Sequence, residues 1–282
     1  MAESSEIEVP GDGEPPLLVD VNGGMAWITL NRPRSLNAMS IELMDRLVDI
    51  LRALSRDSRI RCVGLRGAGR AFCAGGDIAD IARRRVQATN APSVGALLED
   101  QYRTMLRHVD AVRLLHEMPK PTVAAIQGHA VGGGLALALA CDFRVVTETA
   151  KLRVGFAARS LSGDFGISYL LVHTVGSAKA RELLMLDPTI DGVEAHRIGL
   201  ATRLCPDDGL AEAAAGLTGE LAGGPTIALG RIKDNVLAAE TLGFQQVLVT
   251  ESANQRVCAN TGDAAESGAA LAARRAPSFT GR

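Results

Sequence analysis

Two glycine-rich loops, each between an apolar strand-like run and a helical stretch, constrain this chain more than any other feature. Residues 61–65 lead into the loop GAGRAFCAGGD (67–77), and residues 122–126 lead into the loop GHAVGGG (128–134). Strand, glycine turn and helix alternating in this way indicate α/β units with parallel strand pairing. The sequence therefore predicts an α/β fold in which both loops follow the ends of strands.

The segments around these loops complete the predicted domain organisation. Residues 1–16 are acidic and rich in proline and glycine, so we expect a disordered tail. Residues 17–205 are predicted to form the α/β core, which starts with a β-hairpin and an amphipathic helix capped by Ser40. After residue 176 the pattern is helical only. Residues 206–282 are predicted to form a helical region of the kind that makes subunit contacts or closes a site.

Charge and cysteine content exclude several classes of function. The formal net charge of -2 gives no electrostatic reason to expect binding to nucleic acid or to an anionic membrane. The five cysteines lack CxxC spacing, so we expect neither a metal site nor a disulfide framework, and a cytoplasmic location fits best. No apolar run reaches the roughly 20 residues that cross a bilayer, so no membrane span is expected. Small molecules or other proteins are the favoured partners.

The residues after the glycines exclude two of the usual occupants of such a turn. A P-loop needs Lys and Ser or Thr there, whereas Leu135 and Ala136 follow Gly134. A Rossmann turn needs G-x-G-x-x-G, whereas residues 67–69 lead to Phe72. The two loops could instead present backbone N–H groups to one carbonyl oxygen, as an oxyanion hole at a helix N-terminus. Tight packing of helix on strand would explain the glycines equally well.

Four segments together resemble the crotonase superfamily, also called the enoyl-CoA hydratase/isomerase family. They are NRPRSLNAMS, GRAFCAGGDI, AAIQGHAVGGGLALALACDFRV and AHRIGLATRL, and the C-terminal AARRAPSFTGR is similar to the family ending. The resemblance runs from about Leu17 to Phe279. It implies a crotonase-like ββα spiral core with a helical C-terminal part that forms homotrimers, often paired into hexamers.

The resemblance also implies the ligand, an acyl-CoA thioester, with no cofactor beyond the coenzyme A that the substrate carries. The backbone N–H groups of Ala74 and Gly133 are expected to hold the thioester oxygen as it becomes an enolate or a tetrahedral oxyanion. One such donor is typically worth about 3–4 kcal/mol of the barrier. The residues expected to contact the acyl group or coenzyme A are Arg34, Ala71, Ala74, Gly75, Gly76, Asp77, Ile78, Gly133 and Phe156.

The sequence departs from the two-glutamate hydratases of the family at both glutamate positions. By gapless alignment from Gly133, these positions hold Ala136 and Phe156, neither of which can transfer a proton. One carboxylate, Asp164, falls where dienoyl-CoA isomerases of the family keep an aspartate and where the 4-chlorobenzoyl-CoA dehalogenase keeps its nucleophile. The alternative role for Asp164 is to cap the helix that follows it.

The favoured hypothesis is an enzyme that stabilises a thioester enolate and isomerises a double bond with Asp164 as acid and base. Three alternatives stay open: an enoyl-CoA hydratase with a non-standard mechanism, a thioester hydrolase or dehalogenase with Asp164 as nucleophile, and a catalytically silent acyl-CoA-binding protein. An aromatic content of 3% makes an aryl substrate a minor alternative. His108, on the long predicted helix, could approach the acyl pocket, but packing is its simpler explanation.

Overall fold

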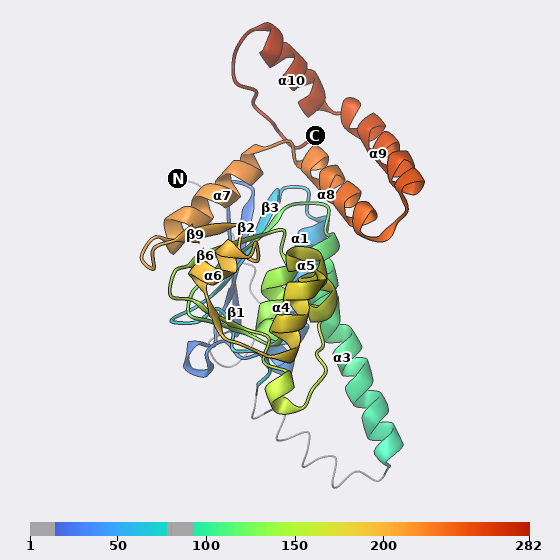
Figure 1. Ribbon diagram of the computed structural model, residues 1–282. Helices are drawn as coiled ribbons and strands as arrows, with labels where there is room; N and C mark the ends of the chain where they lie inside the picture. The colour runs from blue at the N-terminus through green and yellow to red at the C-terminus, as the bar shows by residue number, and fades with distance from the viewer. Residues whose placement is uncertain (1–14, 78–79, 81–92) are drawn as a thin grey trace.

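A six-stranded sheet with helices on both faces forms the centre of the protein (Figure 1). The structure is a computed structural model that describes residues 15–77, residue 80 and residues 93–282. The strand order is β1-β2-β3-β4-β6-β9; β1 and β2 pair antiparallel as the predicted hairpin, and the later neighbours pair parallel. The strand bounds are β1 (Leu17–Asn22), β2 (Met25–Leu30), β3 (Cys62–Gly67), β4 (Thr122–Ile126), β6 (Phe143–Thr147) and β9 (Arg203–Cys205).

A smaller sheet and nine described α-helices complete the fold. The smaller sheet has the order β5-β7-β8, with bounds His129–Val131, Lys151–Arg153 and Ile190–Asp191. The helices in the described part of the chain are α1 (Ile41–Arg56), α3 (Val94–Glu117), α4 (Gly133–Ala140), α5 (Ile167–Met185), α6 (Gly192–Arg197), α7 (Leu210–Gly223), α8 (Thr226–Thr241), α9 (Phe244–Ala259) and α10 (Gly262–Ala272). Within that part, every helix falls short of the length and apolarity that a membrane crossing demands.

The central strand β4 is buried along its whole length, because helices cover both faces of the sheet. Val123 and Ala125 belong to the core cluster under α7. Ala124 and Ile126 belong to the larger cluster that α1, α3, α4 and α5 share. Successive side chains of a strand point to opposite faces, which explains this division. A continuous apolar run is what a parallel strand with two covered faces requires.

The predicted amphipathic helix after Ser40 is confirmed as α1. The Ser40 hydroxyl oxygen accepts a hydrogen bond from the backbone N–H of Leu43 at 3.2 Å, as a helix cap does. Leu43, Leu47 and Leu51 recur at helical spacing and are completely buried. Their stripe packs α1 against the core, and α1 also lies against α3.

The prediction that the chain is only helical after residue 176 is wrong. β8 pairs with β7, and β9 extends the main sheet by pairing parallel with β6. These strands have two and three residues, which is too short for an alternating pattern to be visible in the sequence. In addition, α5 begins at Ile167, in the segment expected to follow Asp164, and continues beyond Gly176, which interrupts it with a φ of 75°.

The last three helices extend beyond one end of the sheet, whereas α7 packs on its face (Figure 1). α8 and α9 lie side by side. Arg61, which immediately precedes β3, connects this unit to the sheet. Its guanidinium donates to the hydroxyl of Thr226 at 3.0 Å and to the backbone carbonyl oxygens of Gly224 at 2.5 Å and Phe279 at 3.1 Å.

A close backbone contact under α8 provides a test of this arrangement. A Cβ atom at Gly230 would lie 2.5 Å from the carbonyl oxygen of Pro119. We expect Gly230→Ala to lower the free energy of unfolding by about 1–3 kcal/mol, because α8 must move away. The matched control is Gly216→Ala in α7, where no atom of the described chain would lie within 4 Å of the added Cβ. The control should gain about 0.5–1 kcal/mol from helix propensity; urea denaturation that shows equal effects would contradict the contact.

Candidate active site

The two glycine loops meet at a cavity of about 190 Å³ beyond the carboxyl ends of β3 and β4. The loop after β3 contributes residues 74–77, and the loop after β4 contributes residues 131–133. The other walls come from α1, α3 and the segment that precedes α5. Their apolar side chains are mainly thioethers and phenyl rings: Met39, Met44, Met105, Phe156 and Phe165. The predicted meeting of the two loops at one site is therefore what the structure shows.

The loop after β3 directs the backbone N–H of Gly76 away from the segment that precedes α1. The carbonyl oxygen of Gly75 accepts a hydrogen bond from the N–H of Met39 at 2.8 Å. Because the C=O and N–H groups of one trans peptide point in opposite directions, the N–H of Gly76 points away from Met39. Gly76 borders the cavity. Its N–H is therefore a candidate donor to a ligand there.

The prediction that Ala74 supplies an oxyanion donor is wrong, because its N–H is already used within the protein. This group donates to the carbonyl oxygen of Leu36 at 3.0 Å. The backbone N–H groups of Ala74 and Gly76 point in different directions because the chain turns at Gly75, whose φ is 88°. A Cβ atom at residue 75 would also lie 2.7 Å from the carbonyl oxygen of Val131. The sequence shows a glycine at this position but not its φ, so it could not decide between the N–H groups of Ala74 and Gly76.

The loop after β4 ends directly in the N-terminus of α4. Gly132 is the N-cap, with φ 58° and ψ -126°, and its N–H donates to the carbonyl oxygen of Arg153 at 3.1 Å. The first N–H to reach back within the helix is that of Ala136, which donates to Gly132 at 3.0 Å. The N–H of Gly133 therefore precedes the helix's own hydrogen bonds, at the end where the helix dipole is positive. Gly133 borders the cavity, as expected.

The glycines of the second loop also permit close packing, as their alternative explanation from the sequence requires. A Cβ atom at Gly134 would lie 2.5 Å from the carbonyl oxygen of Cys73. A Cβ atom at Gly133 would lie 2.9 Å from the sulfur of Met39. The bridge between Cys73 and Ala130 joins the two loops by backbone hydrogen bonds. The absence of side chains thus lets α4 begin against the first loop.

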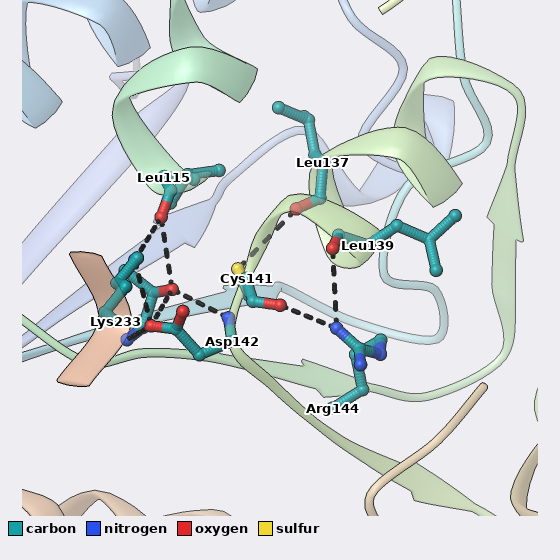
Figure 2. A network of polar contacts seen from close by, with 8 residues as sticks. Leu115, Leu137, Leu139, Cys141, Asp142, Arg144 and Lys233 are labelled. Atoms are coloured by element: carbon teal, nitrogen blue, oxygen red, sulfur yellow. Dashed lines mark hydrogen bonds and ion pairs between the residues drawn. The ribbon is translucent and has the colours of Figure 1, made fainter. Parts of the chain in front are cut away.

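The C-terminal end of α4 is closed by a buried cation (Figure 2). The Arg144 guanidinium donates to the carbonyl oxygens of Cys141 at 2.6 Å and Leu139 at 3.4 Å, and also to Leu200 at 2.6 Å. Burial lowers the pKa of Arg144 from its usual value. A positive charge beside the last carbonyl groups of a helix stabilises the helix dipole. The fully apolar α4 is thereby held at both ends by polar contacts.

Asp142, next to this end of α4, has a structural role. Its Oδ2 atom accepts hydrogen bonds from the Nζ of Lys233 at 3.0 Å and from the backbone N–H and hydroxyl of Thr122 at 2.8 and 2.9 Å. Lys233 also donates to the carbonyl oxygen of Leu115 at 2.9 Å (Figure 2). These contacts connect α8, α3 and β4 behind the cavity. Asp142 does not line the cavity that the glycine loops form.

Asp164 is the carboxylate that the sequence singled out, and it lines the cavity. Its Oδ1 atom is buried without a hydrogen-bond partner in the part of the chain that the structure describes. Burial raises the pKa of this carboxyl. The alternative role as a helix cap is wrong, because Gly166 is the N-cap of α5 and no side chain caps this end. A buried carboxyl with an unused oxygen and a raised pKa is suited to proton transfer.

The turn that carries Asp164 is strained. Gly163, Phe165 and Gly166 all have positive φ, of 106°, 52° and 70°. A left-handed conformation at a residue other than glycine costs about 1–3 kcal/mol, and such strain is concentrated at functional sites. The turn gains support from packing, since a Cβ at Gly133 would lie 3.5 Å from the ring of Phe165. The packing of Phe165 near Gly133 thus helps to keep the strained turn, and with it Asp164, at the cavity.

The two glutamate positions of the hydratases remain without acid or base in the folded structure. Ala136 is completely buried near the start of α4, and Phe156 is 9% exposed and lines the cavity. Asp77 and Asp80 also border the cavity. Asp77 pairs with Arg32 at 2.8 Å, and Asp80 accepts a hydrogen bond from the N–H of Ile41 at 3.1 Å. These two carboxylates therefore hold the first loop and the start of α1.

His108 lines the same cavity, although packing was its simpler explanation from the sequence. The residue is 7% exposed, and its Nε2 atom lies 2.8 Å from Oδ1 of Asp45. Arg107 also pairs with this carboxylate, at 2.7 Å. The sequence signal was weak, because Asp45 on α1 and His108 on α3 are far apart in the chain. Only the packing of α1 on α3 joins them.

The remaining predicted contacts are not tested by this cavity. Arg34 is exposed in a 3-10 turn (Pro33–Ser35), and Ala71 is buried where its carbonyl oxygen accepts a hydrogen bond from Asn37 at 2.8 Å. Neither residue lines the cavity. Ile78 lies outside the described residues. Among those described, no group of three or more His, Cys, Asp or Glu residues is placed to hold a metal ion.

A second cavity, of about 310 Å³, lies between α5 and α8 and includes neither glycine loop. Its lining is mainly apolar, with Tyr169 and His173 on α5 and Glu240 on α8. The Tyr169 hydroxyl donates to Glu240 at 3.2 Å. The two candidate backbone donors and the carboxyl oxygen that lacks a partner among the described residues belong to the smaller cavity, which is therefore the candidate active site.

Comparison with known proteins agrees with this geometry. The family model described as enoyl-CoA hydratase/isomerase matches residues 20–282. The chain belongs to the enoyl-CoA hydratase/isomerase family. It is 36% identical to the 1,2-epoxyphenylacetyl-CoA isomerase of Escherichia coli (strain K12), over 94% of this chain and 98% of that protein. The expectation of a crotonase family member is thus confirmed.

Solved structures of this family confirm the fold class. A Streptomyces coelicolor A3(2) structure is 35% identical with a TM-score of 0.87, and the match covers 100% of both chains. The enoyl-CoA hydratase from Polaromonas sp. JS666 is 28% identical with a TM-score of 0.85, over 94% of this chain and 99% of that one. The mixed α/β core with several C-terminal helices is therefore shared with these enoyl-CoA hydratase/isomerase family structures.

Asp164 should destabilise the folded protein at neutral pH. A carboxyl whose pKa is higher in the folded than in the unfolded state reduces stability as the pH rises through that interval, and the penalty is absent below it. We expect Asp164→Asn to raise the melting temperature at pH 7, and the gain should shrink as the pH falls toward the ordinary aspartate range, near about 4. Calorimetry at several pH values measures this difference. If Asp164→Asn were less stable than the wild type at pH 7, favourable contacts of the ionised Asp164 carboxylate would outweigh the cost of its burial.

Proposed function

We propose that this protein isomerises a carbon–carbon double bond in the acyl chain of a coenzyme A thioester, with Asp164 as the proton-transfer group. One observation carries the proposal: a buried carboxyl oxygen without a described partner lines the same cavity as Gly76 and Gly133, the two glycines whose N–H groups we assign to an oxyanion. This combination suits the removal of a proton next to a thioester carbonyl.

The proposed chemistry begins at the carbon next to the thioester carbonyl. The Asp164 carboxylate takes a proton from this carbon, and the electron pair of the C–H bond moves into an enolate. The N–H groups of Gly76 and Gly133 hold the enolate oxygen, where each donor contributes about 3–4 kcal/mol of transition-state stabilisation. Return of a proton to the carbon two positions further along moves the double bond. No water is added and no group leaves.

Isomerisation is favoured over hydration by the residues at the two glutamate positions of the hydratases. Standard hydration in this family uses two glutamates, and Ala136 and Phe156 stand at those positions. The Escherichia coli relative with an isomerase name aligns along nearly its whole length, which supports the same reaction class. The thioether and phenyl walls suit an apolar acyl group. The phenylacetyl group in that relative's name makes a cyclic acyl group the second candidate substrate.

The proposal includes the remaining expectations on ligand and assembly. Gly75, Gly76 and Asp77 would border the pantetheine path, with Arg34 near the phosphates. Copies of the chain would assemble as trimers or hexamers. Exposed apolar side chains on the C-terminal helices support such contacts: Val236 on α8 is 53% exposed, and Val249 on α9 is 70% exposed.

Hydrogen exchange tests the proposed function directly. A panel of 2-enoyl, 3-enoyl and cyclic enoyl-CoA thioesters is incubated with the protein in deuterated water and analysed by mass spectrometry. We expect the wild type to introduce deuterium and to move the double bond. Asp164→Asn should lower both rates by about 10²–10⁴-fold, because the proton acceptor is lost. Coenzyme A affinity, measured by calorimetry, should stay within a few-fold of the wild type.

The control for this variant is Asp208→Asn, at an exposed aspartate outside the cavity, which should react as the wild type does. Equal turnover by Asp164→Asn and the wild type would refute the role of Asp164. An acyl adduct trapped on Asp164 would instead support the nucleophilic alternative. Tight binding of the whole panel without turnover would support a silent acyl-CoA-binding protein.

A further inference from the structure

We propose that His108, positioned by Asp45, is a second catalytic residue that exchanges a proton with the acyl chain from a wall other than that of Asp164. This inference rests on the proposed isomerisation and adds a group to it. His108 and Asp164 both line the cavity of about 190 Å³, His108 from α3 and Asp164 from the turn before α5. In the described cavity lining, His108 is the only side chain whose ordinary pKa lies near neutrality.

The imidazole is held in one orientation by its carboxylate partner. Nε2 of His108 lies 2.8 Å from Oδ1 of Asp45, and the His108 side chain is 8% exposed. A carboxylate that accepts from one ring nitrogen fixes the ring orientation, favours the tautomer with a proton on that nitrogen and stabilises the imidazolium. Arg107 pairs with the same carboxylate at 2.7 Å and so limits the motion of Asp45.

The position of α3 brings this histidine close to the turn of Asp164. Val112 lies one helical turn after His108, and its Cγ1 atom would lie 4.0 Å from a Cβ at Gly166. Because residues i and i+4 share a helix face, His108 lies on the face of α3 that packs toward this turn. The other charged groups at the cavity are Asp77, Asp80 and Arg159. Of these, Asp77 and Asp80 hold backbone or arginine groups.

A purely structural role explains this pair less well. The Asp45 side chain is 33% exposed, and a polar pair that reaches solvent contributes little to stability. α1 and α3 already pack through apolar residues such as Leu47 and Leu115 in the core. The histidine of the pair lies where α3 reaches the cavity, which Met105 and both glycine loops also line. A group that must exchange protons accounts for a histidine at this position.

Two groups divide the proton transfer in a balanced way. The Asp164 carboxylate removes a proton from C2 of a 3-enoyl thioester, and the C–H electron pair forms the dienolate. The His108 imidazolium donates a proton to C4, and the π electrons of the former C3–C4 double bond form the new C4–H bond. The thioester carbonyl reforms as the C2–C3 double bond appears. Asp164 then holds one proton that His108 lacks, and exchange with water restores both groups.

The division predicts where each hydrogen in the product comes from. If Asp164 acted alone, part of the hydrogen taken from C2 would reappear at C4. With His108 as the donor, the hydrogen at C4 comes from water. Loss of His108 should therefore separate the two halves of the reaction, since enolisation at C2 needs only Asp164 and the backbone donors.

The experiment uses 3-hexenoyl-CoA in two forms. Substrate with two deuterium atoms at C2 is converted by the wild type in ordinary water, which shows where the C2 hydrogen goes. Unlabelled substrate is incubated in deuterated water, which measures exchange at C2. We expect wild-type 2-hexenoyl-CoA with no deuterium at C4. His108→Gln should exchange the C2 hydrogens at close to the wild-type rate but form product about 10²-fold or more slowly. His173→Gln, on α5 outside this cavity, is the matched control and should behave as the wild type. Melting temperatures check that each variant is folded.

Asp45→Asn keeps His108 in place and decides the question if His108→Gln fails to fold. It should slow product formation while C2 exchange continues. Product formation within a few-fold of the wild type in His108→Gln or Asp45→Asn would overturn the inference, as would deuterium transfer from C2 to C4 in the wild type. Absence of both C2 exchange and 2-hexenoyl-CoA formation in the wild type would refute the proposed function itself and this role for His108 with it.

Discussion

The site depends on the contact between two backbones, where the start of α4 lies against the loop after β3. Gly134 approaches Cys73 so closely that a single Cβ atom would meet the carbonyl oxygen of Cys73. Hydrogen bonds between Cys73 and the β5 backbone fix the distance between the loops. Main-chain groups positioned in this way lose little freedom when a ligand binds, because no rotatable side chain must be ordered.

Because α4 is buried, the polar backbone groups at its two ends need partners from the surrounding elements. All eight residues of the helix are buried and apolar, so its ends carry the only polar groups that need partners. The N-terminal end opens toward the cavity, and the C-terminal end receives Arg144. Asp142 and Lys233 then connect this end to α3 and α8. The same helix thus links the ligand cavity, the sheet and the C-terminal helices.

Sequence reasoning identified the elements with a clear period and missed those set by a single residue. The hairpin, α1 with its Ser40 cap and the buried β4 each extend over several residues, so their patterns are visible. β9 has three residues and depends on pairing with β6, which no local pattern encodes. The position of Asp164 was predictable from the family motif. The sequence could not show that the Asp164 side chain does not cap α5, because only the structure identifies Gly166 as the N-cap.

Within the site, sequence reasoning placed the loops correctly but selected Ala74 instead of Gly76. One positive φ at Gly75 reverses the peptide between them. Backbone direction at one glycine has no compositional signal, whereas family resemblance identifies the loop as a whole. The pair of His108 and Asp45 was missed for another reason, since it forms only through the packing of α1 on α3.

The glycine contact also has an evolutionary consequence. Groups of the main chain cannot be deleted by a side-chain substitution, and replacing the glycines would disrupt the packing of α4. A descendant of this chain would therefore keep the proposed oxygen-binding groups while its proton-transfer residues drifted. New reactions could arise at residues 108, 136, 156 and 164, which come from α3, α4 and the segment between β7 and α5. In this fold, the backbone groups of the glycine loops are thus structurally separate from the side chains that can be substituted.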